Sequence, residues 1–134
     1  GLPCILESQG NPKAHLILRG ANIGPNYQLA EIEKIKAKVK SEMPALVIDC
    51  SHGNSSKNPL LQPEVLKTIV AERAQTQVRG VMLESHLVDG QQKISDQMTY
   101  GQSVTDGCLG WNKTEQLLFQ VAQELVLRPL KRSA

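Results

Sequence analysis

Three short apolar runs divide the chain into similar parts. They lie at residues 15–19, 45–49 and 81–83, and turn-forming or polar clusters follow each of them. Val78 and Gly80 precede the third run and extend it backwards. Runs of this length and continuity predict buried strands, because a strand with one solvated face alternates apolar and polar residues.

Helical periodicity follows each of these runs. Apolar residues three or four positions apart predict an amphipathic helix over about residues 28–40, then a second helix with Pro63 near its first turn. A last helix is expected to have Asn112 as its N-cap and to end before Pro129, after a long loop at 87–111. Strand and helix therefore alternate, which predicts the α/β class with a parallel sheet buried on both faces.

Composition narrows the class of protein. The chain has 134 residues, of which 40% are hydrophobic and 21% charged, as expected for one soluble domain. Fifteen Lys and Arg against thirteen Asp and Glu give a net charge of +2, which does not argue for nucleic acid or a membrane surface as partner. No apolar stretch approaches the roughly 18 residues that span a bilayer, and the three cysteines form no CxxC pair. We therefore expect a cytoplasmic protein.

Ionisable side chains stand where each predicted strand ends. Arg19 closes the first strand, His52 and Lys57 follow the second, Glu84 follows the third, and Asp106 lies on the long loop after it. Ligands of parallel sheets bind outside the carboxyl ends of the strands, where the loops are free to vary. The pattern therefore predicts one common pocket at this edge.

The side chains gathered there have a definite chemistry. His52, Glu84 and Asp106 offer one imidazole and two carboxylates, which suit a divalent metal such as Mn²⁺, Fe²⁺, Co²⁺ or Zn²⁺. Arg19 and Lys57 indicate an anionic ligand beside the metal, because a guanidinium gives a phosphate or carboxylate two parallel hydrogen bonds.

Plainer interpretations of the same residues stay open. His52 also fits a hydrogen-bonded structural histidine, and His86, two residues after Glu84, competes with it as a ligand. The two acidic residues also fit helix caps, salt-bridge partners or an Asx turn. Arg19 also fits an ion pair with a strand carboxylate such as Asp49.

Several segments together resemble type I 3-deoxy-D-arabino-heptulosonate 7-phosphate (DAHP) synthase in order and spacing. The resemblance runs from about residue 10 to the end of the last helix. Its most specific strings are DCSHGNSSK at 49–57 and ESHL at 84–87. The supporting strings are GNP at 10–12, ILRG at 17–20, GPNY at 24–27, GVML at 80–83 and YGQSVTDGCLGW at 100–111.

The resemblance implies a fold and an activity. The family has a (β/α)8 TIM barrel, of which residues 1–134 would be a single partial domain holding the last three βα units. Residues 1–9 would be the remnant of a small hairpin, with a short strand within Leu2–Glu7. The implied reaction is the metal-dependent condensation of phosphoenolpyruvate with erythrose 4-phosphate, the first step of the shikimate pathway to aromatic amino acids.

The resemblance also implies residue roles. By motif, His52, Glu84 and Asp106 are the metal ligands, and His86 is not a ligand. Arg19 binds phosphoenolpyruvate, and it acts with His52 and Lys57 as a catalytic residue.

The family's cysteine metal ligand and most of its substrate-binding residues precede the matched segment. Three strands alone would also leave unpaired sheet edges in water. We therefore expect the chain to be inactive without the N-terminal part and to require the rest of the barrel or a homo-oligomer. The alternatives are a non-catalytic fragment or interaction remnant of the family, and a related synthase that condenses phosphoenolpyruvate with a pentose phosphate.

Overall fold

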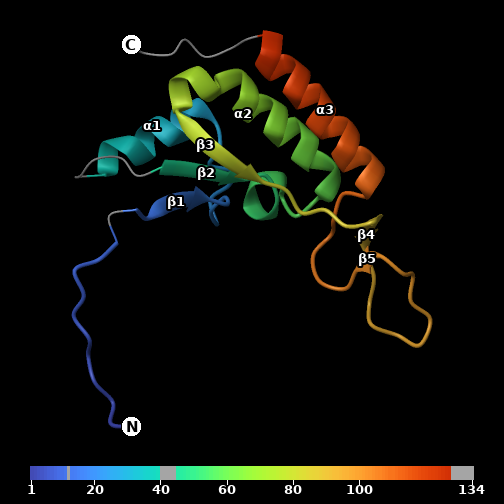
Figure 1. Cartoon of the computed structure of the whole chain (residues 1–134), viewed down its shortest axis with the longest axis horizontal. Coiled ribbons are helices and arrows are strands. Elements are labelled where there is room, and N and C mark those ends of the chain that lie inside the picture. The colour runs from blue at the N-terminus through green and yellow to red at the C-terminus, as the bar shows by residue number, and fades with distance from the viewer. Residues whose placement is uncertain (12, 40–44, 128–134) are drawn as a thin grey trace.

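The computed structural model describes residues 1–11, 13–39 and 45–127. Its centre is a three-stranded sheet with the order β1-β2-β3 and parallel pairing throughout. Three helices lie on one side of this sheet (Figure 1), so the predicted α/β class with parallel strands is confirmed. The strands are β1 (His15–Leu18), β2 (Ala45–Asp49) and β3 (Val78–Met82), and the helices are α1 (Leu29–Lys38), α2 (Gln62–Thr76) and α3 (Trp111–Leu127).

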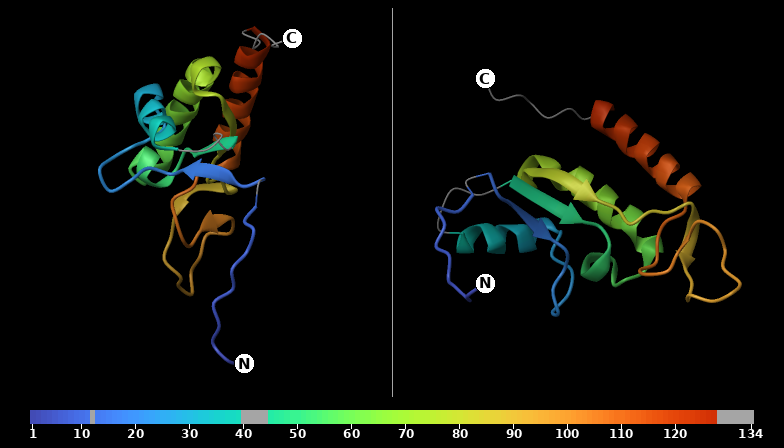
Figure 2. Two further views of the ribbon diagram at one scale, coloured as in Figure 1. Left: turned by 90° about the vertical axis from the view of Figure 1, so that its left-hand side faces the viewer. Right: turned by 60° about the horizontal axis from the view of Figure 1, so that its bottom comes forward.

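The two faces of the sheet differ in burial. Leu18, Leu46 and Ile48 are buried in the core with the helices. On the opposite face Ile17 and Met82 remain 42% and 39% exposed. The expectation of a sheet buried on both faces is therefore wrong for the described residues, because no helix covers the second face (Figures 1 and 2).

The helices follow the predicted periodicity. Four apolar residues of α2 are buried, and Ile32 of α1 is fully buried. The first turn of α1 is held from α2, because the Leu29 N–H donates to the Glu72 carboxylate at 2.8 Å. The helix expected over 28–40 is described up to Lys38, and residue 40 lies outside the described residues. The buried residues of α2 that form the predicted stripe are Val65, Leu66, Ile69 and Val70.

The start of α3 differs from the expectation. The helix begins at Trp111, so Asn112 lies in its first turn and the predicted N-cap is wrong. The Asp89 carboxylate holds the helix start from a distant segment, since it accepts the N–H of Gly110, the residue before the helix, at 2.7 Å and pairs with Lys113 at 2.8 Å. Most of the apolar residues of α3 stay exposed, and Leu117 is the one that is buried.

Two segments carry corrections. Leu2–Glu7 is exposed and has no secondary structure, so the strand expected there is wrong. The segment expected to be a loop contains β4 (Val88–Gln91) and β5 (Gln102–Ser103), which form a separate small sheet. The side chain of Gln92 links this segment internally, with hydrogen bonds to the Thr99 and Gln102 carbonyls. Hydrogen bonds from a side-chain amide do not require apolar residues at a regular spacing, so hydrophobic periodicity could not predict this small sheet.

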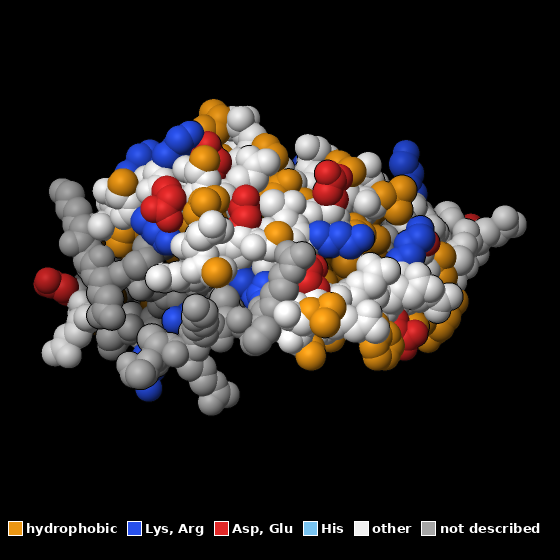
Figure 3. All heavy atoms as spheres, turned by 90° about the horizontal axis from the view of Figure 1, so that it is seen from above, with side chains coloured by type: hydrophobic (Ala, Val, Ile, Leu, Met, Phe, Trp, Pro, Cys, Tyr) orange, Lys and Arg blue, Asp and Glu red, His pale blue; other side chains and the backbone are white. Residues whose placement is uncertain are grey.

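The helix-bearing side of the molecule mixes apolar side chains with charges of both signs (Figure 3). Among the described residues, no helix combines the length and the apolar character needed to cross a bilayer.

Candidate metal centre

The centre of the site is a tight turn directly after β2. A 3-10 helix, η1 (His52–Ser55), begins there, and His52, Ser56 and Lys57 adopt left-handed backbone angles with φ of 48°, 53° and 60°. Non-glycine residues rarely adopt such angles, at a cost of roughly 1–2 kcal/mol each. The surrounding contacts must therefore hold this turn in place.

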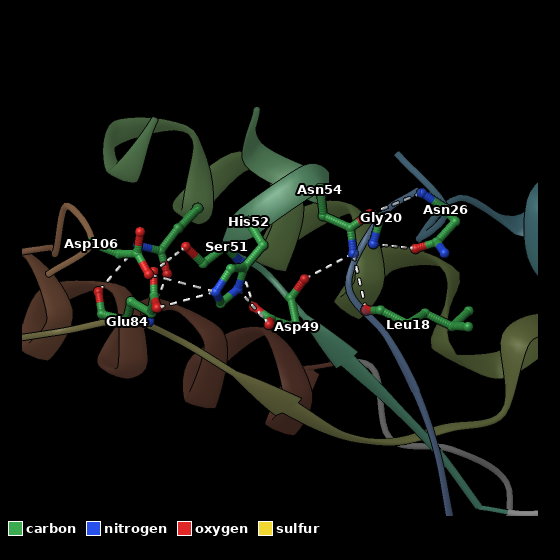
Figure 4. A network of polar contacts seen from close by, with 10 residues as sticks. Leu18, Gly20, Asn26, Asp49, Ser51, His52, Asn54, Glu84 and Asp106 are labelled. Atoms are coloured by element: carbon green, nitrogen blue, oxygen red, sulfur yellow. Dashed lines mark hydrogen bonds and ion pairs between the residues drawn. The ribbon is translucent and has the colours of Figure 1, made fainter. Parts of the chain in front are cut away.

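The buried side chain of Asn54 is the main contact. Its amide N–H groups donate to the carbonyls of Leu18 at 3.1 Å and Asp49 at 2.8 Å, and its oxygen accepts the Asn26 N–H at 2.8 Å (Figure 4). One amide therefore ties together the carboxyl ends of β1 and β2 and the loop after β1.

A close approach of two glycines completes this junction. Gly53 donates its N–H to the Arg19 carbonyl at 3.0 Å, and Gly20 has a φ of +83°. A Cβ atom on Gly20 would lie 2.5 Å from the Cα of Gly53, well inside any permitted contact. Only glycine fits at position 20, and the close packing places His52 beside the end of β1.

The imidazole of His52 is oriented by Asp49. The Nδ1 atom lies 2.8 Å from Oδ2 of Asp49, whose other oxygen accepts the Ser51 N–H at 2.8 Å. The Nε2 atom then faces the acidic residues, 3.5 Å from Glu84 Oε1 and 3.9 Å from Asp106 Oδ2. This arrangement of carboxylate, histidine and open Nε2 is typical of metal-binding histidines.

Glu84 lies two residues beyond the end of β3 and is held at both its side chain and its backbone. Ser51 Oγ donates to Glu84 Oε2 at 2.5 Å, which leaves Oε1 directed toward the imidazole (Figure 4). The backbone N–H of Glu84 donates to the Gln62 side chain at 2.8 Å, and its carbonyl accepts from the same amide at 3.1 Å.

The three side chains fit a metal by their spacing. One ligand atom each from His52, Glu84 and Asp106 lies within 4.8 Å of the others. Nitrogen and oxygen ligands bind zinc at about 2.0–2.2 Å, so two atoms on one ion lie at most about 4.4 Å apart. The distances of 3.5 and 3.9 Å from the imidazole meet this limit, and the oxygens of the two carboxylates lie within 4.8 Å of each other. The set has one nitrogen and two oxygen donors, which suits several divalent ions.

A cavity of about 350 Å³ opens over these ligands. Lys57 reaches it, as predicted from the strand-end pattern. Its lining is mostly polar and consists of Ser51, His52, Lys57, Glu84, Gln91, Thr105, Asp106 and Gly107.

Two predicted residues are not brought into the cluster. The Arg19 side chain is exposed and does not line the cavity, and it forms no ion pair within the part of the chain that the structure describes. The alternative ion pair between Arg19 and Asp49 does not form among the described residues either. Asp49 instead contacts the His52 ring and accepts the Ser51 N–H. His86 is exposed and its Nδ1 accepts the Leu87 N–H at 2.8 Å, because β3 ends at Met82 and its alternation does not extend that far.

Cys50, between the site and the core, behaves as a plain buried thiol. It is fully buried, and burial, followed by the charge of Asp49, raises its pKa to about 12. A thiol with this pKa is protonated at neutral pH and therefore a poor ligand or nucleophile.

Sequence reasoning missed several residues of the site. Asp49 and Ser51 belong to the polar segment that follows the second apolar run, but nothing in their spacing showed that they orient His52 and Glu84. Asn54 was visible only as part of a motif. Gln62 gave no signal at all, because a glutamine at a helix start is ordinarily exposed.

Comparisons with known proteins agree with one family. The model of the "DAHP synthetase I family" matches residues 3–119. A phospho-2-dehydro-3-deoxyheptonate aldolase of Haemophilus influenzae is 40% identical over 96% of this chain, and a Tyr-sensitive enzyme of that name from Enterobacter agglomerans is 44% identical over 93%. The solved structure of the Francisella tularensis aldolase aligns with a TM-score of 0.83 and 38% identity over 93% of the chain. The chain spans 37%, 62% and 38% of these three proteins.

Proposed function

The chain belongs to the DAHP synthetase I family, and from this premise we propose that it forms the metal-holding part of a 3-deoxy-7-phosphoheptulonate synthase. The observation that carries the proposal is the convergence of His52, Glu84 and Asp106 on one polar cavity at the carboxyl ends of parallel strands. Active sites of barrels with parallel strands lie at this edge.

We propose further that residues 1–134 are a single partial domain, the last three βα units of a (β/α)8 barrel. Helices on one face and an exposed apolar opposite face support this, since a barrel places its helices outside and packs the other face with side chains from further strands. Ile17 and Met82 would then be covered by the rest of the barrel. Residues 1–9 would join a small hairpin only in that larger assembly.

His52, Glu84 and Asp106 would hold a divalent ion, Mn²⁺, Fe²⁺, Co²⁺ or Zn²⁺, which when bound supplies a Lewis acid for the aldehyde oxygen of erythrose 4-phosphate. The protein's own part is orientation. Asp49 fixes the imidazole with Nε2 open, and Ser51 fixes the carboxylate of Glu84, so little rearrangement accompanies binding.

The substrates would be phosphoenolpyruvate and erythrose 4-phosphate. Lys57 lies on the cavity and offers a positive charge to a phosphate or carboxylate. Arg19 would reach phosphoenolpyruvate once the neighbouring strands are present, because its backbone adjoins Gly53, next to His52. The vinyl carbon of phosphoenolpyruvate would attack the aldehyde carbon, and water would add as phosphate leaves. Arg19, His52 and Lys57 are the proposed catalytic residues.

The test is to complete the barrel. This chain is joined to, or mixed with, the N-terminal portion of one of the relatives, and the product is called the completed barrel below. Phosphate release is then measured with both substrates and added metal. We expect metal-dependent turnover that His52→Ala abolishes and that His86→Ala, a matched exposed histidine, leaves within about twofold.

Three results would each oppose a part of the proposal. Full activity of the His52→Ala variant would remove the metal assignment. A folded completed barrel that binds metal but releases no phosphate would instead favour a non-catalytic remnant. Turnover by the 134-residue chain alone, as a monomer, would refute the need for the rest of the barrel.

A further inference from the structure

Gln62, the first residue of α2, is fully buried, which is unusual for a glutamine. Both polar atoms of its side-chain amide form hydrogen bonds to one partner. Nε2 donates to the Glu84 carbonyl at 3.1 Å, and Oε1 accepts the Glu84 N–H at 2.8 Å. A side chain here forms the pair of hydrogen bonds that a neighbouring strand would form.

Glu84 needs such a partner because the sheet stops short of it. The pairing of β2 with β3 ends at Met82. Beyond that point the Glu84 carbonyl also accepts the Leu109 N–H at 2.9 Å, but its own N–H is bound by Gln62. A part-buried donor left without an acceptor destabilises the fold. The amide of Gln62 therefore sets where the backbone of Glu84 lies.

The position of this backbone decides where the carboxylate points. From its fixed backbone the Glu84 side chain meets Ser51 Oγ at one oxygen and faces His52 Nε2, 3.5 Å away, with the other. Two independent elements thus hold one residue, α2 through its backbone and the end of β2 through its side chain. Gln62 itself does not line the cavity, so it acts on the site through Glu84.

We propose that Gln62 is a positioning residue that sets the divalent-metal affinity of the site by fixing Glu84. The inference rests on the metal site of the proposed function. It assigns a role to a residue that contacts neither metal nor substrate.

The experiment uses the completed barrel with Co²⁺ as the probe. Gln62→Met keeps the length of the side chain and removes both hydrogen bonds. We expect it to weaken Co²⁺ binding roughly 10- to 100-fold, the usual effect of losing an outer partner of a metal ligand. The visible spectrum of bound Co²⁺ should change as one carboxylate is misplaced, and hydrogen exchange at the Glu84 amide should become faster. Gln75→Met, an exposed change on the same helix, should alter none of these.

A double-mutant cycle separates positioning from general damage. In a Glu84→Ala background the Gln62→Met change should no longer affect Co²⁺ affinity, because its target is gone. If Gln62→Met does not fold, Gln62→Asn replaces it; its shorter amide satisfies one Glu84 group at most, and we expect an intermediate loss of affinity.

Each outcome decides the matter. Wild-type affinity in a folded Gln62→Met or Gln62→Asn variant, or an equal loss in the Glu84→Ala background, overturns the inference and leaves the proposed function intact. A wild-type completed barrel that binds no Co²⁺ overturns the metal site and this inference together.

Discussion

The Nδ1 atom of His52 lies 2.8 Å from Oδ2 of Asp49, three residues earlier in the chain. A carboxylate accepts hydrogen bonds and donates none, so Nδ1 donates in this contact, and in the neutral ring the lone pair is then on Nε2. That nitrogen is the one that faces Glu84 and Asp106. The turn after β2 therefore fixes both the direction of the imidazole and its tautomer.

Asp49→Asn should weaken metal binding by the completed barrel about 10- to 100-fold, because an amide in place of the carboxylate no longer enforces this tautomer. Calorimetric titration with Mn²⁺ or Co²⁺ measures the loss. Asp96→Asn, a change on the exposed segment after β4, is the matched control and should be neutral. Unchanged affinity in Asp49→Asn would show that the contact is structural only.

Gly20→Ala should destabilise the completed barrel by roughly 2–4 kcal/mol. The new Cβ would lie 2.5 Å from the backbone of Gly53, and the residue would also have to keep a φ of +83°. The free energy of unfolding in urea measures the effect. Gly10→Ala tests the backbone angle alone, since Gly10 has a φ of +76° and nothing lies within 4 Å of its Cβ position; it should cost about 1 kcal/mol or less.

If Gly20→Ala and Gly10→Ala lowered the free energy of unfolding by the same amount, the loops at the strand ends would have to separate to admit the methyl group. The packing of β1 against the turn after β2 would then not be what places His52.

The architecture of the sheet was predictable because its signal is local. Uninterrupted runs such as residues 45–48 have no polar residue that could face water, and the helix stripe of α2 has a period that only a helix satisfies. The open sheet face was not predictable in the same way. Ile17 and Met82 lie in apolar runs, which predicts that they are buried. No described element covers them.

Some residues of the site could likewise be predicted from the sequence, and others could not. His52 and Glu84 could be selected because each follows a predicted strand, and parallel strands bring their ends to one edge; Asp106 could be selected because it lies on the long loop after the third of these strands. Residues that act through backbone contacts, such as Gln62 and Asn54, could not be selected. Their partners lie 22 and 36 residues away along the chain, and nothing in the composition of either segment marks the pairing.

Alkylation should distinguish the three cysteines of the native chain. Burial and the nearby Asp49 charge raise the pKa of Cys50 to about 12, so almost no thiolate exists at about pH 8 and no reagent can reach it. We expect iodoacetamide to label exposed Cys4 readily and Cys50 not at all, with Cys108 slower than Cys4 because burial raises its pKa too. Peptide mapping by mass spectrometry reads the result. All three should react in urea, and native labelling of Cys50 at the Cys4 rate would contradict the burial.

Asp89→Asn should loosen the start of α3 in a pH-dependent way. The Lys113 ammonium and then the Gly110 N–H hold the pKa of Asp89 below its usual value. A depressed folded-state pKa means that the stabilisation by Asp89 is fully present above the unfolded value of about 3.9 and is lost as pH falls through the folded-state value.

The loss of unfolding free energy in Asp89→Asn at neutral pH should be roughly 1 kcal/mol. Most of it comes from the hydrogen bond at the helix start, because both charged groups are exposed and their ion pair contributes little. Hydrogen exchange of the first α3 amides should therefore differ between wild type and variant at pH 7, and the difference should shrink only as the pH falls below the unfolded value of about 3.9. Lys113→Met should have a smaller effect in the same direction, and a difference that persisted unchanged into acid would show that the carboxylate's charge is irrelevant to this helix start.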